Sequence, residues 1–197
     1  GFKVTVYAWD RECKYPLNEI VDGIVVHRIH LKSKFGNFFT VIATLPIFWI
    51  ITLSKILSER VDVVHCHDFD TIFVGFLWRR IKKAPVIYDV HDLYYSWITI
   101  QPLFVRHIVQ KTIQHLDLLF SKKANLLIVP TENLGQSCDG LKEYYLSSCV
   151  KNVITLWNTP SRLFSYDGES QTTNKFTIGY IGGQRTIDNF VLLFNAV

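Results

Sequence analysis

Short apolar runs rich in β-branched residues alternate with longer stretches of helical length along most of the chain. Most of the short runs are continuously apolar, which is typical of parallel strands buried on both faces. The expected strands cover residues 2–8, 24–29, 61–67, 85–90, 124–130 and 152–157. The expected helices cover residues 37–58, 70–82, 102–121 and 132–147. This alternation predicts an α/β fold, a doubly wound parallel sheet with right-handed crossovers, and Thr131 is the expected N-cap of the last helix.

The pattern changes near residue 160 and predicts a division into domains. Residues 1–160 form the expected sheet domain, and residues 161–175 are rich in polar residues and glycine, so we expect an interdomain linker there. Residues 176–197 predict the first strand and helix of a second α/β domain. The chain contains no Met and begins beside an expected strand, so the sequence predicts an internal piece of a longer protein.

Composition and net charge limit the kinds of molecule that the protein is expected to bind. A chain of 197 residues with 49% hydrophobic residues can bury one good core. A formal net charge of +4 is too small to indicate nucleic-acid binding, and it suits an anionic ligand or an acidic membrane surface. The four cysteines form no CxxC pair and no zinc spacing, so we expect reduced thiols in a cytoplasmic protein.

An uncharged segment lies between Lys34 and Lys55. Its 20 residues are nearly enough to span a bilayer, where ~20 apolar residues are needed. Pro46, several polar residues and the need to return to the same sheet argue against a span. We therefore expect a crossover helix, partly in the core and partly on an anionic membrane surface through residues 37–57, which makes the protein peripheral. Complete burial and a true span are the alternatives.

Two expected strands end in a His-Asp pair, His67-Asp68 and His91-Asp92. Functional groups of parallel α/β sheets collect at the carboxyl ends of the strands, so we expect both pairs to meet at one edge. His65 and His67 have a metal-ligand spacing, and a metallohydrolase that also uses Asp68, His91 and Asp92 is one interpretation. Because this spacing is common by chance, we expect His65 to be a core histidine bonded to backbone and no metal to be bound. Asp92 has a second interpretation, as a cap of the following turn.

A glycine pair, Gly182 and Gly183, follows the last expected strand. It does not match the GxGxxG dinucleotide fingerprint. The pair predicts either a tight turn or a phosphate site, because glycine amides before a helix N-terminus bind anions.

The order of these motifs resembles the N-terminal half of family 4 glycosyltransferases, which have the GT-B fold. The motifs are GFKVTVYA, VDVVHCHD, PVIYDVHDLY, ANLLIVPTE, NVITLWN and FTIGYIGG, and together they extend over nearly the whole chain. The resemblance implies two Rossmann-like domains facing each other across a cleft, with the acceptor on the N-terminal domain and a nucleoside diphosphate sugar on the C-terminal one. It also implies that the family's first strand is missing here.

The resemblance assigns roles to individual residues. His91 would be the catalytic residue that contacts the transferred sugar and steadies positive charge in a retaining transfer. The acceptor side of the cleft would be lined by His67, Asp68 and Asp92. The interdomain cleft would add Thr131, Glu132 and Asn158. The donor diphosphate would meet Gly182, Gly183 and Arg185. No metal or cofactor is implied beyond the donor co-substrate, because amides, a helix dipole and cations take up the diphosphate charge.

The sequence also departs from the family. Many members have an Arg where Gly183 stands and a Lys near the position of Asp188 or Asn189, and here Arg185 would have to reach the diphosphate. Because most of the donor domain is absent, this chain alone is expected to be inactive. The acceptor would be a glycan or a lipid-linked molecule. The alternatives are a nucleotide-sugar epimerase of similar fold and a non-catalytic GT-B subunit that binds or scaffolds.

Overall fold

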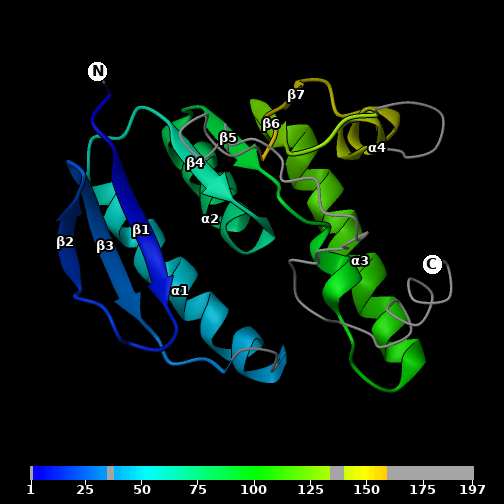
Figure 1. The fold of residues 1–197 in the computed structure, drawn as a ribbon, viewed down its shortest axis with the longest axis horizontal. Coiled ribbons are helices and arrows are strands. Elements are labelled where there is room, and N and C mark those ends of the chain that lie inside the picture. Colours follow the sequence, from blue (N-terminus) through cyan, green and yellow to red (C-terminus); the bar gives the residue numbers. More distant parts are fainter. Residues whose placement is uncertain (1, 35–37, 134–139, 159–197) are drawn as a thin grey trace, which may run out of the picture. The chain divides into compact units, whose positions relative to one another are not determined.

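The computed structural model describes residues 2–34, 38–133 and 140–158. The chain separates into two compact units, Gly1–Asn158 and Thr159–Val197, and the described residues belong to the first (Figure 1). The expected linker, the start of a second domain and the proposed donor residues Gly182, Gly183 and Arg185 lie outside the described residues.

A four-stranded sheet forms the larger half of the described fold. Its strands are β4 (Val64–His67), β5 (Val86–Asp89), β6 (Leu126–Val129) and β7 (Val153–Thr155). All three neighbouring pairs are parallel, in the order β4-β5-β6-β7. The connecting helices are α2 (Phe69–Lys82), α3 (Leu103–Lys123) and α4 (Leu141–Ser147). A parallel sheet flanked by helices is the Rossmann-like arrangement that the sequence predicted.

A second sheet has three strands in the order β1-β3-β2. Strand β1 (Thr5–Asp10) is parallel to β3 (Ile24–His30), as expected, whereas β2 (Asn18–Val21) is antiparallel to β3 and was not predicted. Asp22 and Gly23 both have positive φ, 50° and 81°, which is the backbone of a two-residue hairpin turn.

Helix α1 (Phe38–Ser58) lies between the three-stranded sheet and α2. Figure 1 shows it passing behind β1 and β3. Phe48 stacks on Trp9 of β1 at 5.5 Å, and on the other side Trp49 packs on Phe73 of α2 at 4.6 Å. The indole Nε1 of Trp49 also donates a hydrogen bond to the Asp70 carbonyl oxygen at 2.5 Å. A short 3₁₀ helix, η1 (Tyr94–Trp97), leads toward α3.

The prediction for the fourth helix was wrong at its start. Residues 131–133 are not helical, and α4 begins at Leu141 with Gly140 as its N-cap. Thr131 nevertheless serves α4 from a distance, because its Oγ1 accepts a hydrogen bond from the Leu141 amide at 3.1 Å. A capping hydroxyl is thus supplied by a residue ten positions earlier in the chain.

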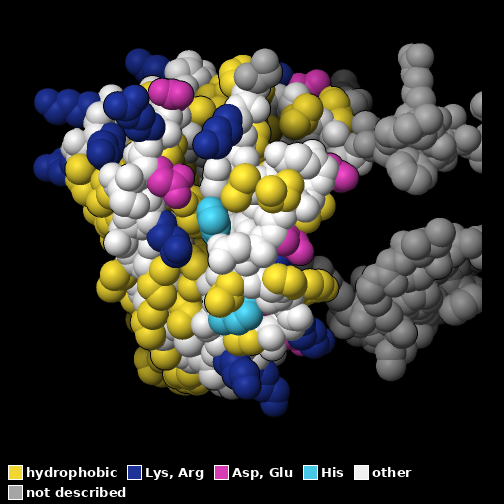
Figure 2. All heavy atoms as spheres, turned by 90° about the vertical axis from the view of Figure 1, so that its left-hand side faces the viewer, with side chains coloured by type: hydrophobic (Ala, Val, Ile, Leu, Met, Phe, Trp, Pro, Cys, Tyr) yellow, Lys and Arg dark blue, Asp and Glu magenta, His cyan; other side chains and the backbone are white. Residues whose placement is uncertain are grey.

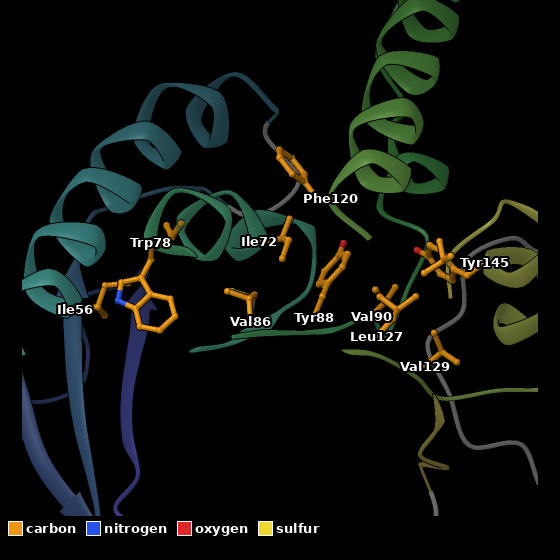
Figure 3. Packing of buried hydrophobic residues seen from close by; sticks show 13 residues of the cluster. Ile56, Ile72, Trp78, Val86, Tyr88, Val90, Phe120, Leu127, Val129 and Tyr145 are labelled. Atoms are coloured by element: carbon orange, nitrogen blue, oxygen red, sulfur yellow. The ribbon is translucent and has the colours of Figure 1, made fainter. Parts of the chain in front are cut away.

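The core lies between one face of the four-stranded sheet and helices α2, α3 and α4. Figure 3 shows side chains from the strands and helices packed together there. Those least exposed, each at 1% or less, are Ile72, Trp78, Val86, Tyr88, Val90, Leu127, Val129 and Tyr145. The same face carries Cys66, which is buried as expected.

One carboxylate links three elements inside this core. Asp117 of α3 is 5% exposed and accepts hydrogen bonds from the hydroxyls of Tyr88 on β5 (2.6 Å) and Tyr145 on α4 (2.7 Å). Burial raises the pKa of Asp117, and the two hydroxyl donors oppose that rise. Two charge-assisted bonds of this kind satisfy a group that would otherwise be costly to bury.

Candidate functional site

The opposite face of the four-stranded sheet carries a row of histidines. The register pairs His67 of β4 with Asp89 of β5. Because side chains alternate along a strand, His65 and His67 share a face with Asp89 and His91. Their side chains are 49%, 64%, 13% and 30% exposed, respectively. The sheet therefore has one face that is packed with apolar side chains and another that presents four polar ones.

Asp89 is the centre of this polar row. His65 Nε2 lies 3.0 Å from its Oδ2, His67 Nδ1 lies 3.8 Å from Oδ2, and His91 Nε2 lies 3.5 Å from Oδ1. Asp89 was not predicted to be a site residue, because it lies inside an expected strand. One signal in the sequence could have identified it. Asp89 precedes His91 by two positions, and residues two positions apart in an extended chain lie on the same face of a sheet.

The prediction that His65 is a core histidine bonded to backbone was wrong. Its side chain is about half exposed, and its ring nitrogen pairs with the carboxylate of Asp89 rather than with a backbone group. It thereby fixes the orientation of that carboxylate.

Asp68 holds the two strand ends together. It is the N-cap of α2, with φ 62° and ψ 173°, a conformation that is essentially restricted to glycine. Its own amide donates to the Asp89 carbonyl oxygen at 2.8 Å, and its Oδ1 accepts from the amide of His91 at 2.9 Å. The two His-Asp motifs therefore meet, and the side chain of the first positions the backbone of the second.

The imidazoles of His67 and His91 lie against one another, with ring centroids 4.2 Å apart. His91 Nδ1 is also 3.5 Å from the side-chain Nδ2 of Asn158, which follows β7. His91 is thus contacted by residues from the ends of three strands, β4, β5 and β7.

Other residues selected from the sequence lie outside this cluster. Glu132 accepts hydrogen bonds from Lys142 Nζ (2.6 Å) and Thr155 Oγ1 (2.9 Å), and these donors lower its pKa. With Thr131, it anchors the start of α4. Asp92 is exposed and makes no hydrogen bond or ion pair within the described part of the chain.

A further carboxylate lies in the first turn of α2. Burial, followed by the charge of Asp68, raises the pKa of Asp70 to about 6, and the positive charges of Arg11 and His67 only partly oppose this rise. Asp70 was not predicted to be a site residue either. Its environment depends on packing between α1 and α2, which no local pattern reveals.

The arrangement supports chemistry on a polar ligand at the carboxyl edge of the sheet. Imidazoles that face a carboxylate can donate to or accept from hydroxyl groups near neutral pH. One ligand atom each from His67, Asp89 and His91 also lies within 4.8 Å of the others, which is close enough to share a metal ion.

The chain belongs to Glycosyltransferase Family 4, whose model matches residues 1–140. Among solved structures, it is similar to sucrose-phosphate synthase from Thermosynechococcus elongatus, with a TM-score of 0.58 and 14% sequence identity. That similarity covers 80% of this chain and 38% of the other chain. It shows the fold, a Rossmann-like half of the GT-B type. A comparison with curated proteins finds no match.

Proposed function

We propose that the protein transfers a sugar from a nucleoside diphosphate sugar to an acceptor, with retention of configuration at the transferred carbon. The observation that carries this proposal is the placement of His91. Its ring lies at the carboxyl edge of the parallel sheet, inside the family match, and contacts residues from neighbouring strand ends. Ligands of open α/β sheets bind at this edge.

In this proposal, His91 contacts the transferred sugar while positive charge develops on the ring. The carboxylate of Asp89 lies 3.5 Å from His91 Nε2 and would hold the ring in position. His67 and Asp68 lie beside it and would orient the acceptor hydroxyl. Preorganised groups of this kind act mainly in the transition state.

The donor diphosphate would be held without a metal, by glycine amides, a helix N-terminus and cations such as Arg185. No cofactor beyond the donor is proposed. Thr131 and Glu132 would support the donor-facing side by fixing α4, and Asn158 would do so by its contact with His91.

We also propose that the protein attaches to anionic membranes from the cytoplasmic side through one face of α1. By length and composition alone, Phe39–Ser58 is apolar enough to span a bilayer, with mean hydropathy 1.9. Phe48, Thr52 and Ile56 are buried in the protein, so a position along the surface fits the packing better. A glycan or lipid-linked acceptor would suit an enzyme at that surface.

The test of the catalytic proposal is the His91→Ala variant of the full-length enzyme, assayed with excess chelator. Turnover should fall by ~10² or more, with little change in thermal stability, because the side chain acts in the transition state. His107→Ala, an exposed histidine on α3, is the matched control and should keep full turnover. Unchanged turnover in His91→Ala, or complete loss of activity with chelator alone, would contradict the proposal.

A further inference from the structure

Three side chains that can ligate a metal converge at the ends of β4 and β5. His91 Nε2 lies 3.5 Å from Asp89 Oδ1, and His67 Nδ1 lies 3.8 Å from Asp89 Oδ2. A tetrahedral zinc ion with bonds of ~2.0–2.2 Å separates neighbouring ligand atoms by about 3.4 Å. Each imidazole nitrogen is already close to that spacing from one of the two oxygens of Asp89. One ligand atom from each of the three residues lies within 4.8 Å of the others, and the His67 side chain is 64% exposed, so a small rotation of it would shorten these separations.

His91 Nε2 also needs a partner. The atom is excluded from solvent and accepts or donates no hydrogen bond among the described residues. A buried polar atom without a partner is costly, and a bound ion would satisfy it. The Asn158 amide lies 3.5 Å from the other ring nitrogen, Nδ1. With its oxygen turned toward the ring, this amide would accept the Nδ1 proton and leave Nε2 free as a ligand.

His65 completes the arrangement as an outer partner. Its Nε2 lies 3.0 Å from Asp89 Oδ2 and orients the carboxylate that would bind the ion. Carboxylates that ligate metals are themselves usually hydrogen-bonded, and this outer contact tunes affinity. In the sequence, His65 and His67 had a metal-ligand spacing but no metal was expected; in this proposal His67 is a ligand and His65 is not.

We propose that His67, Asp89 and His91 form a zinc-type metal site whose fourth position is open to water. Two imidazoles and one carboxylate are a donor set that suits Zn²⁺. Occupation of this site inhibits the enzyme, because it ties up the imidazole of His91 that would contact the transferred sugar. The inhibition rests on the proposed function, whereas metal binding does not depend on it.

Metal binding is measured on the full chain with Zn²⁺ by titration calorimetry, and with Co²⁺ by its visible absorption. One ion should bind, and Co²⁺ should give the intense visible bands of a tetrahedral site. His67→Ala should weaken Zn²⁺ binding by ~100-fold or more, because it removes a ligand. His65→Ala should weaken it by ~10-fold, within the range typical of an outer partner. His107→Ala is the control, and its affinity should be unchanged.

Because the His67 side chain is exposed, His67→Ala should leave the fold intact, and circular dichroism checks this. Equal Zn²⁺ affinity in wild type, His67→Ala and Asp89→Asn would overturn the site, as would the absence of stoichiometric binding. If Zn²⁺ binds as expected but does not inhibit turnover reversibly, the metal site stands and the role of His91 is wrong.

Discussion

The backbone of Asp68 is strained at the point where its side chain is used. Its φ of 62° and ψ of 173° belong to a region that costs a residue with a Cβ about 1–3 kcal/mol. The conformation is maintained by hydrogen bonds to Asp89, His91 and Thr71. Strain of this kind at a strand end is expected where a side chain must be positioned for function.

Two substitutions distinguish the effect of the strained backbone of Asp68 from the effect of its side chain. Asp68→Ala and Asp68→Gly both remove the acceptor for the His91 amide, and only the glycine variant relieves the backbone. We expect Asp68→Gly to be more stable than Asp68→Ala by about 1 kcal/mol in denaturant unfolding, and both to lose turnover. At a position without backbone strain, a glycine variant is less stable than the alanine variant by about 0.5–1 kcal/mol. If Asp68→Gly is less stable than Asp68→Ala, the backbone of Asp68 is not strained.

Asp70 gives a prediction for pH. Burial raises its pKa to about 6, from 3.8 in the unfolded chain, so the folded state binds its proton more tightly. Its contribution to stability is therefore fully present below pH 3.8 and is lost as pH rises through about 6. Relative to Asp70→Asn, the wild type should lose about 2 kcal/mol of unfolding free energy between about pH 4 and 7. A difference that stays constant with pH would show that Asp70 is not perturbed.

The sequence identified the histidines of the site but missed Asp89. His-Asp pairs at strand ends stand out because loops follow them, so His67, Asp68 and His91 were found together. Asp89 stands within an apolar run, and its importance depends on the register that pairs it with His67. Register is a property of two strands, so no single segment of sequence could have shown it.

At the scale of elements, Gly75 sets the distance between α2 and the sheet. A Cβ at this position would lie 2.3 Å from Cys66 Sγ and 3.1 Å from a methyl of Val86. The helix can pack this closely only because position 75 has no side chain.

Gly75→Ala should therefore lower the unfolding free energy by about 1–3 kcal/mol, although alanine is the better helix former. Cys66→Ala removes the sulfur that the new methyl group would meet. In that background Gly75→Ala should cost less, because only the tight contact with Val86 remains, and a denaturant double-mutant cycle measures the difference. An equal cost in both backgrounds would mean that the sulfur is not the obstacle.

The helices and strands with a clear hydrophobic pattern were predicted correctly. The elements whose limits depend on a turn or on a distant cap were not. The helix over residues 37–58 and the four parallel strands were recovered within a few residues. Strand β2 was missed because its four residues are short and mostly exposed, although the Asp-Gly pair that follows is a strong hairpin signal. The start of α4 was wrong because Thr131 caps it through space rather than in sequence.

At the scale of the whole unit, α1 has two faces. The buried stripe of Phe48, Thr52 and Ile56 packs into the protein. The opposite stripe is apolar and open to solvent, and its large members are Phe39, Ile42, Ile47 and Ile50, which are 47–77% exposed. Phe48 and Trp49 do not belong to this stripe, because Phe48 is 3% exposed and Trp49 packs on α2.

Basic residues lie at one end of this stripe. Trp49 contacts Phe73, and Ile56 lies near Trp78 (Figure 3), so α1 and α2 run in the same direction. Lys55 of α1 is therefore at the same end as the basic last turn of α2, which contains Arg79, Arg80 and Lys82. Figure 2 shows hydrophobic side chains gathered along its left and lower left, below a group of Lys and Arg side chains.

This arrangement predicts binding to anionic membranes by shallow insertion of the exposed stripe. Each basic residue near an anionic surface adds roughly 1 kcal/mol, so attachment should weaken with salt but persist through the apolar contacts. Ile42→Ser combined with Ile50→Ser should abolish most co-sedimentation with anionic liposomes, while neutral liposomes bind little in either case. Ile20→Ser, at a position 73% exposed on β2, is the matched control and should bind like wild type. If the double variant and the control bind equally, α1 is not the membrane surface, and a lipid-linked acceptor loses its structural support.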